Sequence, residues 1–370
     1  MSFDKTMMRS NPNFKFKEII RDKTEALGNH CQLDVFQKEN DQVIMICANF
    51  DMQSNERDYH ISLIDLSTNQ EIKSIPSDQR IMSIRYFQDP KTKKNYFTTS
   101  NHKAKIAVYD LDDDCKCIFE AETKYELFIY TNLMIFDEDK KYVVTSSIGS
   151  NNMTKVYNID SKELKDLNST KDLTVFYMEY WRNEKGAENE KHNIIHCAKN
   201  KVVVTSYPAD KAYLTNEVGE EEPYIQAGCL FKKGGVDHFM FACTYGIVRI
   251  LNLESKQQVY NITHTHGQVH FFGIIWWNEH YLLLNDMQQS RFTVFAIDDG
   301  FRKHGKILCP EMSILRKDPQ NPKNILVELT NNKKMKKVIH PKYGECLITI
   351  GTDWKARLYV NRDIEAQDLE

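Results

Sequence analysis

"GTDWKARLYV", residues 351–360, joins a polar turn to a short run in which apolar and charged residues alternate. Its Asp-Trp pair is either a functional site or part of a phrase that the chain repeats. The choice decides the fold, because repeats of about 20 to 50 residues are typical of solenoids and propellers.

The second half of this stretch recurs along the chain. Similar runs are ISLIDL (61–66), IAVYDL (106–111), TKVYNI (154–159), VVVTS (202–206), VRILNL (248–253), FTVFAI (292–297) and ARLYVN (356–361). The equivalent positions are Ile64, Tyr109, Tyr157, Thr205, Leu251, Phe295 and Tyr359, separated by 45, 48, 48, 46, 44 and 64 residues. KAYLTN (211–216) also resembles the phrase, but using it in place of VVVTS breaks the regular spacing. The near-equal steps indicate a repeated structural unit.

Each unit contains further strand-like segments. A nearly continuous apolar run precedes each copy of the phrase, as in QVIMICANF (42–50) and FMFACT (239–244). Such runs are typical of strands that are buried on both faces. Another run lies upstream, as in RIMSIRYF (80–87), and a more polar one follows, as in NQEIKSI (69–75). Four short strands with polar turns in each unit predict the blades of a β-propeller.

The repeat predicts an all-β fold, a single seven-bladed β-propeller domain of four-stranded antiparallel blades over residues 1–370. The predicted blades are about residues 31–77, 78–122, 123–170, 171–217, 218–263, 264–308 and 335–362. The last of these has only three strands of its own, so FKFKEII (14–20) is predicted to supply the fourth and to remove an exposed sheet edge. The long final step predicts an insertion at 309–334.

These segments resemble the WD-repeat (WD40) family over about residues 14–362. The Trp-Asp hallmark of that family corresponds to Ile64-Asp65, Tyr109-Asp110, Tyr157-Asn158 and Leu251-Asn252, and Asp353 stands at the family's turn aspartate. The family's Gly-His is missing from most units, and HTHGQV (264–269) is the nearest approach. The resemblance implies a seven-bladed propeller that binds other proteins. A narrower likeness, over FYMEYWRNEKG and ACTYGIVRILNLES, is to the Polycomb-type propeller that reads methylated histone tails, although the order of the blades differs.

Composition narrows the class of protein. Hydrophobic residues make up 41% and charged residues 27% of the chain, and the formal net charge is -3. This balance gives no reason to expect a nucleic-acid partner. The nine cysteines are scattered and the first residues lack an apolar signal segment, so we expect an intracellular protein, cytoplasmic or nuclear, with reduced thiols. No apolar run reaches the length of about 18 residues that a membrane span needs.

Several local patterns imitate functional motifs. GFRKHGKI (300–307) has the spacing of a phosphate-binding loop, but Ile307 replaces the Ser or Thr that would hold magnesium. His264, His266 and His270 lie close in sequence without a cysteine or carboxylate to complete a tetrahedral metal site. Cys115 and Cys117 follow three aspartates, which disfavour a reactive thiolate. The basic NNKKMKK (331–337) and the acidic EVGEEEPY (217–224) are interpreted as solvated charged loops. We therefore expect no metal, cofactor or small-molecule substrate.

Three classes of function remain open. We expect a non-catalytic scaffold or subunit of a multiprotein complex, which binds partner peptides or subunits through loops on one face of the propeller. The loops between the second and third strands, and between blades, would display His102, Lys103, Asn152, Tyr245, His266, Gln289 and Trp354. The alternative is a reader of methylated histone tails with an aromatic cage that includes Tyr245 and Trp354. The third class, a propeller enzyme, would need a nucleophile with its base or paired acids, and no such set recurs along the chain.

Overall fold

Each copy of the repeated phrase lies in the third strand of a four-stranded antiparallel sheet in the computed structural model. The third strands are β4 (Tyr59–Asp65), β8 (Lys105–Asp110), β12 (Thr154–Asn158), β16 (Lys201–Tyr207), β20 (Ile247–Asn252), β24 (Arg291–Ala296) and β30 (Ala356–Asn361). The choice between VVVTS and KAYLTN is settled, because Lys201–Tyr207 is a third strand and Lys211–Glu217 is the fourth strand beside it.

The other three layers of strands follow the same order in every sheet. The innermost strands are β2 (Asn29–Gln37), β6 (Ile81–Gln88), β10 (Ile129–Asp137), β14 (Val175–Arg182), β18 (Ile225–Lys233), β22 (Phe271–Asn278) and β28 (Asn332–His340). The second strands are β3 (Val43–Phe50), β7 (Asn95–Asn101), β11 (Lys140–Ser147), β15 (His192–Ala198), β19 (Val236–Cys243), β23 (Tyr281–Asp286) and β29 (Gly344–Gly351). The outermost strands are β5 (Gln70–Ser77), β9 (Lys116–Glu122), β13 (Leu164–Leu167), β17 (Lys211–Glu217), β21 (Gln257–Thr263), β25 (Arg302–Leu308) and β1 (Phe16–Arg21).

The structure describes most of the chain, in sixteen stretches. They are residues 16–21, 29–38, 41–50, 59–125, 129–148, 153–218, 224–243, 247–263, 271–278, 281–286, 291–296, 302–308, 313–317, 325–329, 332–351 and 356–361. Besides the strands of the sheets, these stretches contain the hairpin β26 (Ser313–Lys317) and β27 (Ile325–Leu329), and the short 3-10 helices η3 (Asn168–Thr170) and η4 (Glu188–Glu190).

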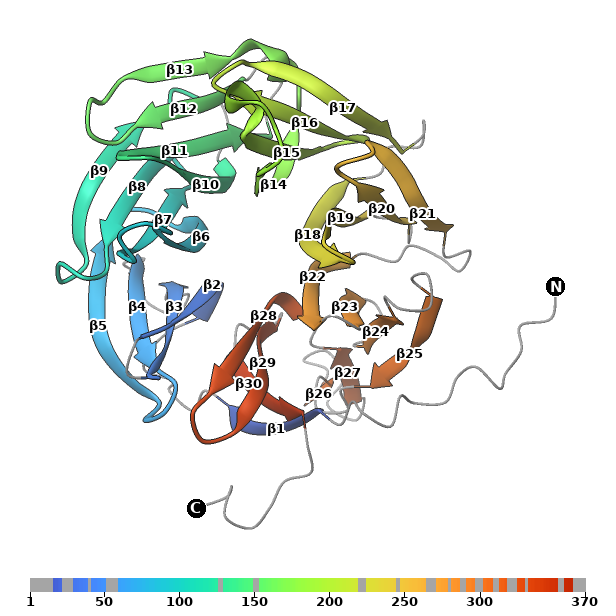
Figure 1. The fold of residues 1–370 in the computed structure, drawn as a ribbon. Helices are drawn as coiled ribbons and strands as arrows, with labels where there is room; N and C mark the ends of the chain where they lie inside the picture. The colour runs from blue at the N-terminus through green and yellow to red at the C-terminus, as the bar shows by residue number, and fades with distance from the viewer. Residues whose placement is uncertain are drawn as a thin grey trace.

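The sheets stand radially around a common centre, and their innermost strands face it (Figure 1). Six sheets consist of four strands that are consecutive in the sequence. The remaining sheet is composite, because β1 from the beginning of the chain pairs antiparallel with β30 from its end. The fold is therefore an all-β propeller of four-stranded antiparallel blades.

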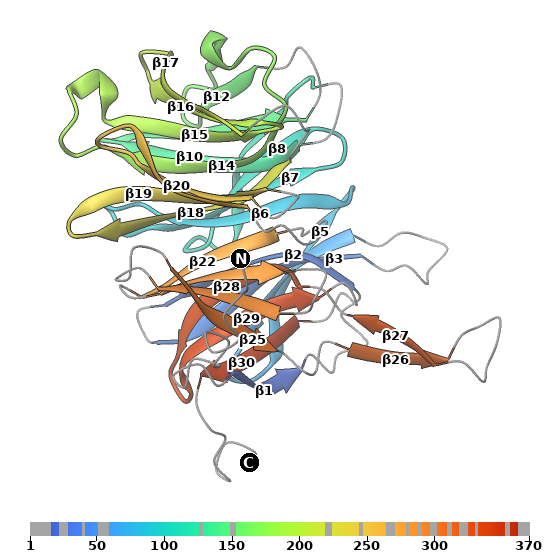
Figure 2. The same cartoon turned by 90° about the vertical axis from the view of Figure 1, so that its right-hand side faces the viewer.

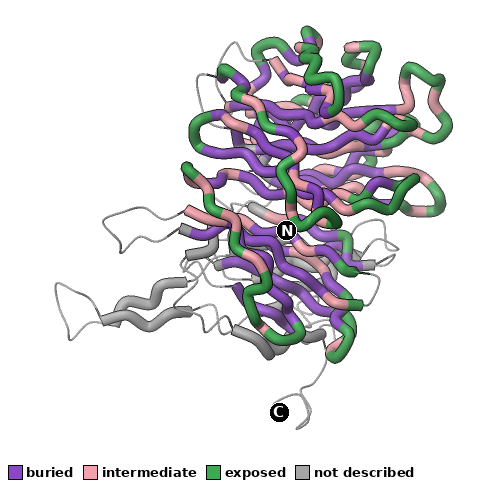
Figure 3. The backbone as a smooth tube through the Cα atoms, turned by 90° about the vertical axis from the view of Figure 1, so that its left-hand side faces the viewer, coloured by how far each residue is buried: buried purple, intermediate pink, exposed green. Residues whose placement is uncertain are grey.

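The core lies between the sheets rather than within one layer. Apolar residues of adjacent sheets form one buried cluster at each of six seams. In Figure 3 the buried residues run through the sheets, and the turns at their ends are mostly exposed. Strands such as β15 and β16 are almost wholly buried, because each of their faces packs against a neighbouring sheet. This two-sided burial explains the continuous apolar runs in the sequence.

The aligned positions have a common structural role. In five of the consecutive sheets the pairing of the third and fourth strands shifts register at this position, beside Ile64, Tyr109, Thr205, Leu251 and Phe295. The next residue is often an Asp or Asn that closes the following turn, as where Asp65 Oδ1 accepts a hydrogen bond from the Ser67 N–H at 2.8 Å. A bulge strengthens the twist of the outer hairpin, so the degenerate Trp-Asp position shapes the blade.

Strand direction defines two faces of the ring. In every sheet the innermost and third strands begin at the same end, and the second strand ends there. That end therefore carries the turns between second and third strands and the connections between sheets. We call it the upper face. The hairpin of β26 and β27 belongs to the connection between β25 and β28 and projects away from the sheets (Figure 2). We expected the basic stretch 331–337 to be a solvated loop, and this expectation is wrong. Strand β28 begins at Asn332 and includes most of the stretch.

Candidate interaction surface

His102 and Lys103 lie on the upper face, in the turn between β7 and β8. The Asn101 side chain holds this turn, because its Oδ1 accepts hydrogen bonds from the backbone N–H groups of Lys103 and Lys105, each at 3.0 Å. The His102 N–H donates to the Arg80 carbonyl at 3.0 Å. Both predicted side chains are exposed on a well-fixed turn, which is the arrangement that a binding surface requires.

The other predicted contact residues lie outside the described residues. They are Asn152, Tyr245, His266, Gln289 and Trp354. The aromatic cage suggested for Tyr245 and Trp354 therefore stays a prediction, as does the expectation that His264, His266 and His270 do not hold a metal ion. Of the seven predicted residues, the described part of the chain contains two, the adjacent residues His102 and Lys103.

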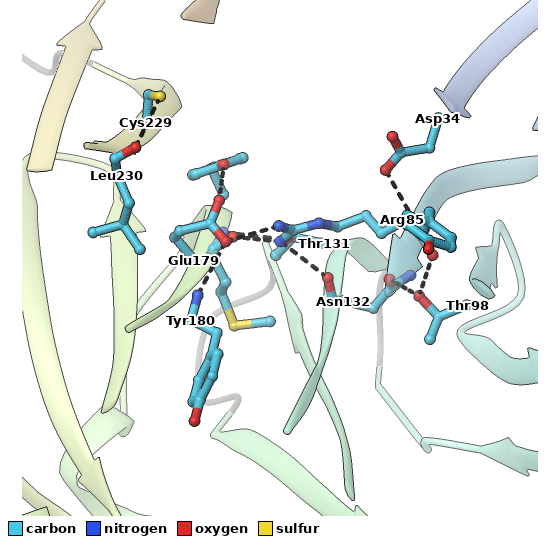
Figure 4. A network of polar contacts seen from close by, with 12 residues as sticks. Asp34, Arg85, Thr98, Thr131, Asn132, Glu179, Tyr180, Cys229 and Leu230 are labelled. Atoms are coloured by element: carbon cyan, nitrogen blue, oxygen red, sulfur yellow. Dashed lines mark hydrogen bonds and ion pairs between the residues drawn. The ribbon is translucent and has the colours of Figure 1, made fainter. Parts of the chain in front are cut away.

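At the centre of the ring, the Arg85 side chain links three innermost strands (Figure 4). From β6, its Nη1 donates to the Asn132 carbonyl of β10 at 3.4 Å and to the Met178 carbonyl of β14 at 2.7 Å. Its Nη2 forms an ion pair with Glu179 Oε1 of β14 at 2.9 Å. Innermost strands have one unpaired edge, so a guanidinium that binds carbonyls from two of them replaces the missing sheet partner.

The partners of Glu179 keep it ionised. Its Oε2 accepts a hydrogen bond from the Tyr177 hydroxyl, and its Oε1 accepts one from the Tyr180 N–H at 3.1 Å. Burial opposes ionisation, but the Arg85 charge and these hydrogen bonds outweigh it and lower the pKa of Glu179. Burial would likewise lower the pKa of Arg85, and the attraction of Glu179 instead raises it. Burial raises the pKa of Tyr177 well above its ordinary value, and the charge of Glu179 adds to the effect.

A second charged contact lies between the innermost strands of the composite sheet and the β2–β5 sheet. Lys336 Nζ of β28 lies 3.1 Å from Asp34 Oδ1 of β2. Asp34 also accepts a hydrogen bond from the Tyr86 N–H of β6 at 3.0 Å and one from the Val35 N–H at 2.8 Å. A nearly buried carboxylate on β2 therefore joins the composite sheet to the second sheet of the ring.

These groups are suited to holding the ring together rather than to reacting. Arg85 and Glu179 satisfy one another, and the tyrosine beside them has a raised pKa, which disfavours a nucleophilic phenolate. Among the described residues, no three or more His, Cys, Asp or Glu side chains are placed to hold a metal ion. Burial raises the pKa of Cys115 and of Cys117. Residues 302–307 of the stretch that imitates a phosphate-binding loop lie in strand β25, which pairs with β24.

Sequence reasoning missed the central charges. Arg85 and Glu179 are each the single charge in an apolar stretch of an innermost strand, IMSIRYF and VFYMEYW, and Asp34 is the single charged residue of β2. Charged side chains are seldom buried unless they are paired, so an isolated charge in such a strand is a usable signal for a partner on another strand.

Comparisons with known proteins identify the fold and nothing narrower. No family model matches the chain, and no curated protein matches its sequence. Among solved structures, the crystal structure of the Cps50 (Swd1) β-propeller domain of Myceliophteria thermophila matches with a TM-score of 0.65. The match covers 94% of this chain and 99% of that one at 10% sequence identity. Within the described stretches, no helix is long and apolar enough to cross a membrane. The chain thus has the fold of the WD40 β-propellers.

Proposed function

We propose that this chain is a protein-interaction scaffold, a subunit of a larger assembly that binds partner peptides or subunits through its upper face. The observation that carries the proposal is the different placement of the central charged side chains and of the polar side chains on the upper face. The central charges Arg85, Glu179 and Asp34 are consumed in contacts between strands, whereas His102 and Lys103 are exposed on a fixed upper turn. A rigid frame with its polar groups presented in loops is suited to recognition.

We further propose that all seven sheets serve as blades of one closed ring. Supporting this, each innermost strand contacts the next along the chain, and β28 contacts β2. The composite sheet then closes the ring, with β1 as its outer strand. A closed ring leaves no sheet face of the first or last blade exposed, and it gives the upper face a fixed geometry.

The test is purification of the tagged full chain from its native cells, followed by mass spectrometry, with matched variants. His102→Ala/Lys103→Ala changes the upper turn of the β6–β9 sheet, and Lys93→Ala/Lys94→Ala changes its lower turn. We expect partners that are recovered with the wild type and the lower-face variant, and reduced with the upper-face variant. Recovery of the wild-type chain alone, or equal loss with both variants, contradicts the proposal. The prediction that the protein is non-catalytic and works in the cytoplasm or nucleus stays part of this proposal.

A further inference from the structure

Strand β21 (Gln257–Thr263) is the outermost strand of its sheet, and its outer edge is unpaired within the described part of the chain. It lies on the rim of the ring (Figure 1). Alternate residues of such a strand direct their backbone N–H and C=O groups away from the sheet. An edge of this kind is a template on which another strand can add, and proteins commonly protect it with charged side chains.

The other six outermost strands carry such charges. Each contains at least one Lys, Arg, Asp or Glu in its sequence: FKEIIR, QEIKSIPS, KCIFEAE, LKDL, KAYLTNE and RKHGKIL. Strand β21, with the sequence QQVYNIT, contains none. It combines β-branched and aromatic residues, which favour strands, with side-chain amides. Among the outermost strands, β21 is therefore the one whose own charges do not oppose pairing with another strand.

The exposed apolar residues of the outermost strands show the same difference. Ile72 of β5 and Leu164 of β13 are each 46% exposed, and Val259 of β21 is 45% exposed. Ile72 and Leu164 each stand between a glutamate and a lysine, in EIK (71–73) and ELK (163–165). Val259 stands in QVY (258–260), so its exposed apolar surface has no charged neighbour along the strand.

Ile72 and Val259 occupy the same place in their sheets. In both sheets the pairing of the third and fourth strands skips this residue, which makes it the extra residue of the bulge. A bulge can itself disfavour pairing at an edge, but both strands have one. The charges beside Ile72 therefore distinguish the two edges, and Ile72 is a matched control for Val259.

The sheet holds β21 in a fixed position. Tyr260 packs against the buried cluster between the β18–β21 and β22–β25 sheets. Gln258 Oε1 accepts a hydrogen bond from Asn216 Nδ2 of β17 in the preceding sheet at 3.3 Å. Because the edge is formed before any partner arrives, pairing requires little further ordering of the strand.

The chemistry of β21 matches a second copy of itself. Side-chain amides both donate and accept hydrogen bonds, so Gln and Asn side chains can pair with their own kind. A two-fold axis between antiparallel copies uses every position of the strand twice, and a strand without charges brings no like charges together. The exposed surface of Val259 is then covered in both copies at once.

We propose that the outer edge of β21 pairs antiparallel with β21 of a second copy of this chain, so that two four-stranded sheets join into one continuous sheet. This is strand addition at an exposed edge, in which backbone hydrogen bonds supply the affinity. The interface goes beyond the proposed scaffold function, because it lies on the rim of the ring and leaves the upper face free.

Sedimentation velocity of the full chain over a range of protein concentrations tests the proposal. We expect a monomer–dimer equilibrium whose dissociation constant changes little with salt, because no ion pair holds the interface. Val259→Lys introduces a charge that the two-fold axis uses twice, and it is expected to weaken dimerisation roughly tenfold. Ile72→Lys adds the same charge at the equivalent place on β5 and should leave the dissociation constant unchanged.

Hydrogen exchange locates the interface. Backbone pairing slows the exchange of β21 amides, so peptides that cover residues 257–263 should gain protection as the protein concentration rises, and peptides from β5 should not. Val259→Lys must melt within a few degrees of the wild type, and Gln257→Lys is the second variant if it does not.

Four results overturn the proposal. They are a chain that stays monomeric at every concentration, a dimer without added protection of β21, and equal weakening of the dimer by Val259→Lys and Ile72→Lys. The fourth is protection of β21 only when a different protein is added, because the edge then pairs with another strand rather than with its own copy.

Discussion

Two neighbouring seams of the ring are filled in different ways. Between the β2–β5 and β6–β9 sheets, aromatic rings stack: Phe36 lies on Tyr86 with centroids 5.3 Å apart, and Phe97 on Tyr109 at 4.6 Å. Between the composite sheet and the β2–β5 sheet, the equivalent places hold smaller aliphatic side chains. A small, partly open cavity of about 10 Å³ remains there, lined by Met45, Ile64, Leu66, Asn69, Ile348, Ala356, Arg357 and Leu358.

The difference in how the two seams are filled follows from one aligned position of the repeat. Tyr109 and Ile64 are equivalent residues of the repeat, and each is paired across the sheet with a second-strand residue, Phe97 or Met45. Where the pair is aromatic the seam is filled, and where it is aliphatic a space is left. The less filled seam is also the one between the composite sheet, which contains β1, and the β2–β5 sheet, so it depends on β1 and on the Asp34–Lys336 contact. We expect it to be the weakest seam of the ring.

The largest effect is expected on removal of β1. Deletion of residues 1–22 removes five residue pairs with β30 and exposes the edge of that strand. At about 1 kcal/mol for each backbone hydrogen bond, the loss is about 5 kcal/mol, or a fall in melting temperature of roughly 10 °C. Differential scanning calorimetry checks it. Deletion of residues 1–13, which leaves β1 in place, is the control, and equal melting of both deletions would contradict the closure by β1.

The next largest effect is expected on loss of the Arg85 clamp, by which we mean the contacts of Arg85 with β10 and β14. These contacts lie away from the closing seam, the seam between the composite sheet and the β2–β5 sheet. Arg85→Met leaves the Glu179 carboxylate partly buried without its cation, at a cost of about 3 kcal/mol. The double variant with Glu179→Gln is expected to recover part of the loss, because no buried charge is then unpaired. Chemical denaturation measures both. Lys91→Met, which breaks an exposed ion pair with Asp139, should change nothing measurable.

At the closing seam, Asp34→Ala is expected to cost about 2 kcal/mol, because the Tyr86 and Val35 N–H groups lose their acceptor. Lys336→Met should cost less than Asp34→Ala, since the Lys336 side chain is 42% exposed and its ion pair is screened by water. Denaturation midpoints give the order. A larger loss for the lysine variant would show that the charge, rather than the hydrogen bonds of Asp34, holds the seam.

The repeat in the sequence accounts for the sheets but not for their seams. The period of the phrase predicts third strands at regular intervals, and apolar runs predict their buried neighbours, because both are local properties. Arg85 and Glu179 are 94 residues apart and meet only when three innermost strands converge. The rings of Phe176, in β14, and Tyr224, just before β18, meet edge to face although they belong to different sheets, and no local pattern reports this contact. Three strands were expected within 335–362, but a lysine-rich start hid the first residues of β28, where the register shifts between Asn332 and Lys334.

Acid should weaken the Arg85 clamp more than the rest of the ring. The partners of Glu179 lower its pKa in the folded state, so its contribution to stability is present above the unfolded value of about 4.3 and is lost as the pH falls through the lower folded value. Denaturant melts at pH 7, 5 and 3.5 should therefore show a steeper decline for the wild type than for Arg85→Met/Glu179→Gln. Parallel declines would mean that other carboxylates control the acid response.

The smallest effect, and the only gain, is expected from filling the closing seam. Ile64→Phe places a ring where the β6–β9 sheet has Tyr109, next to the space lined by Met45 and Leu358. Burying the added apolar surface should stabilise the fold by about 0.5 to 1 kcal/mol. Leu251→Phe is the matched control at the same repeat position, where the side chain is fully buried in a packed cluster and a larger one should cost about 1 to 3 kcal/mol. Thermal melts show whether each substitution raises or lowers the melting temperature. If both variants destabilise, the space at Ile64 is too shallow for a ring, and the weakness of the seam lies in its charged contacts instead.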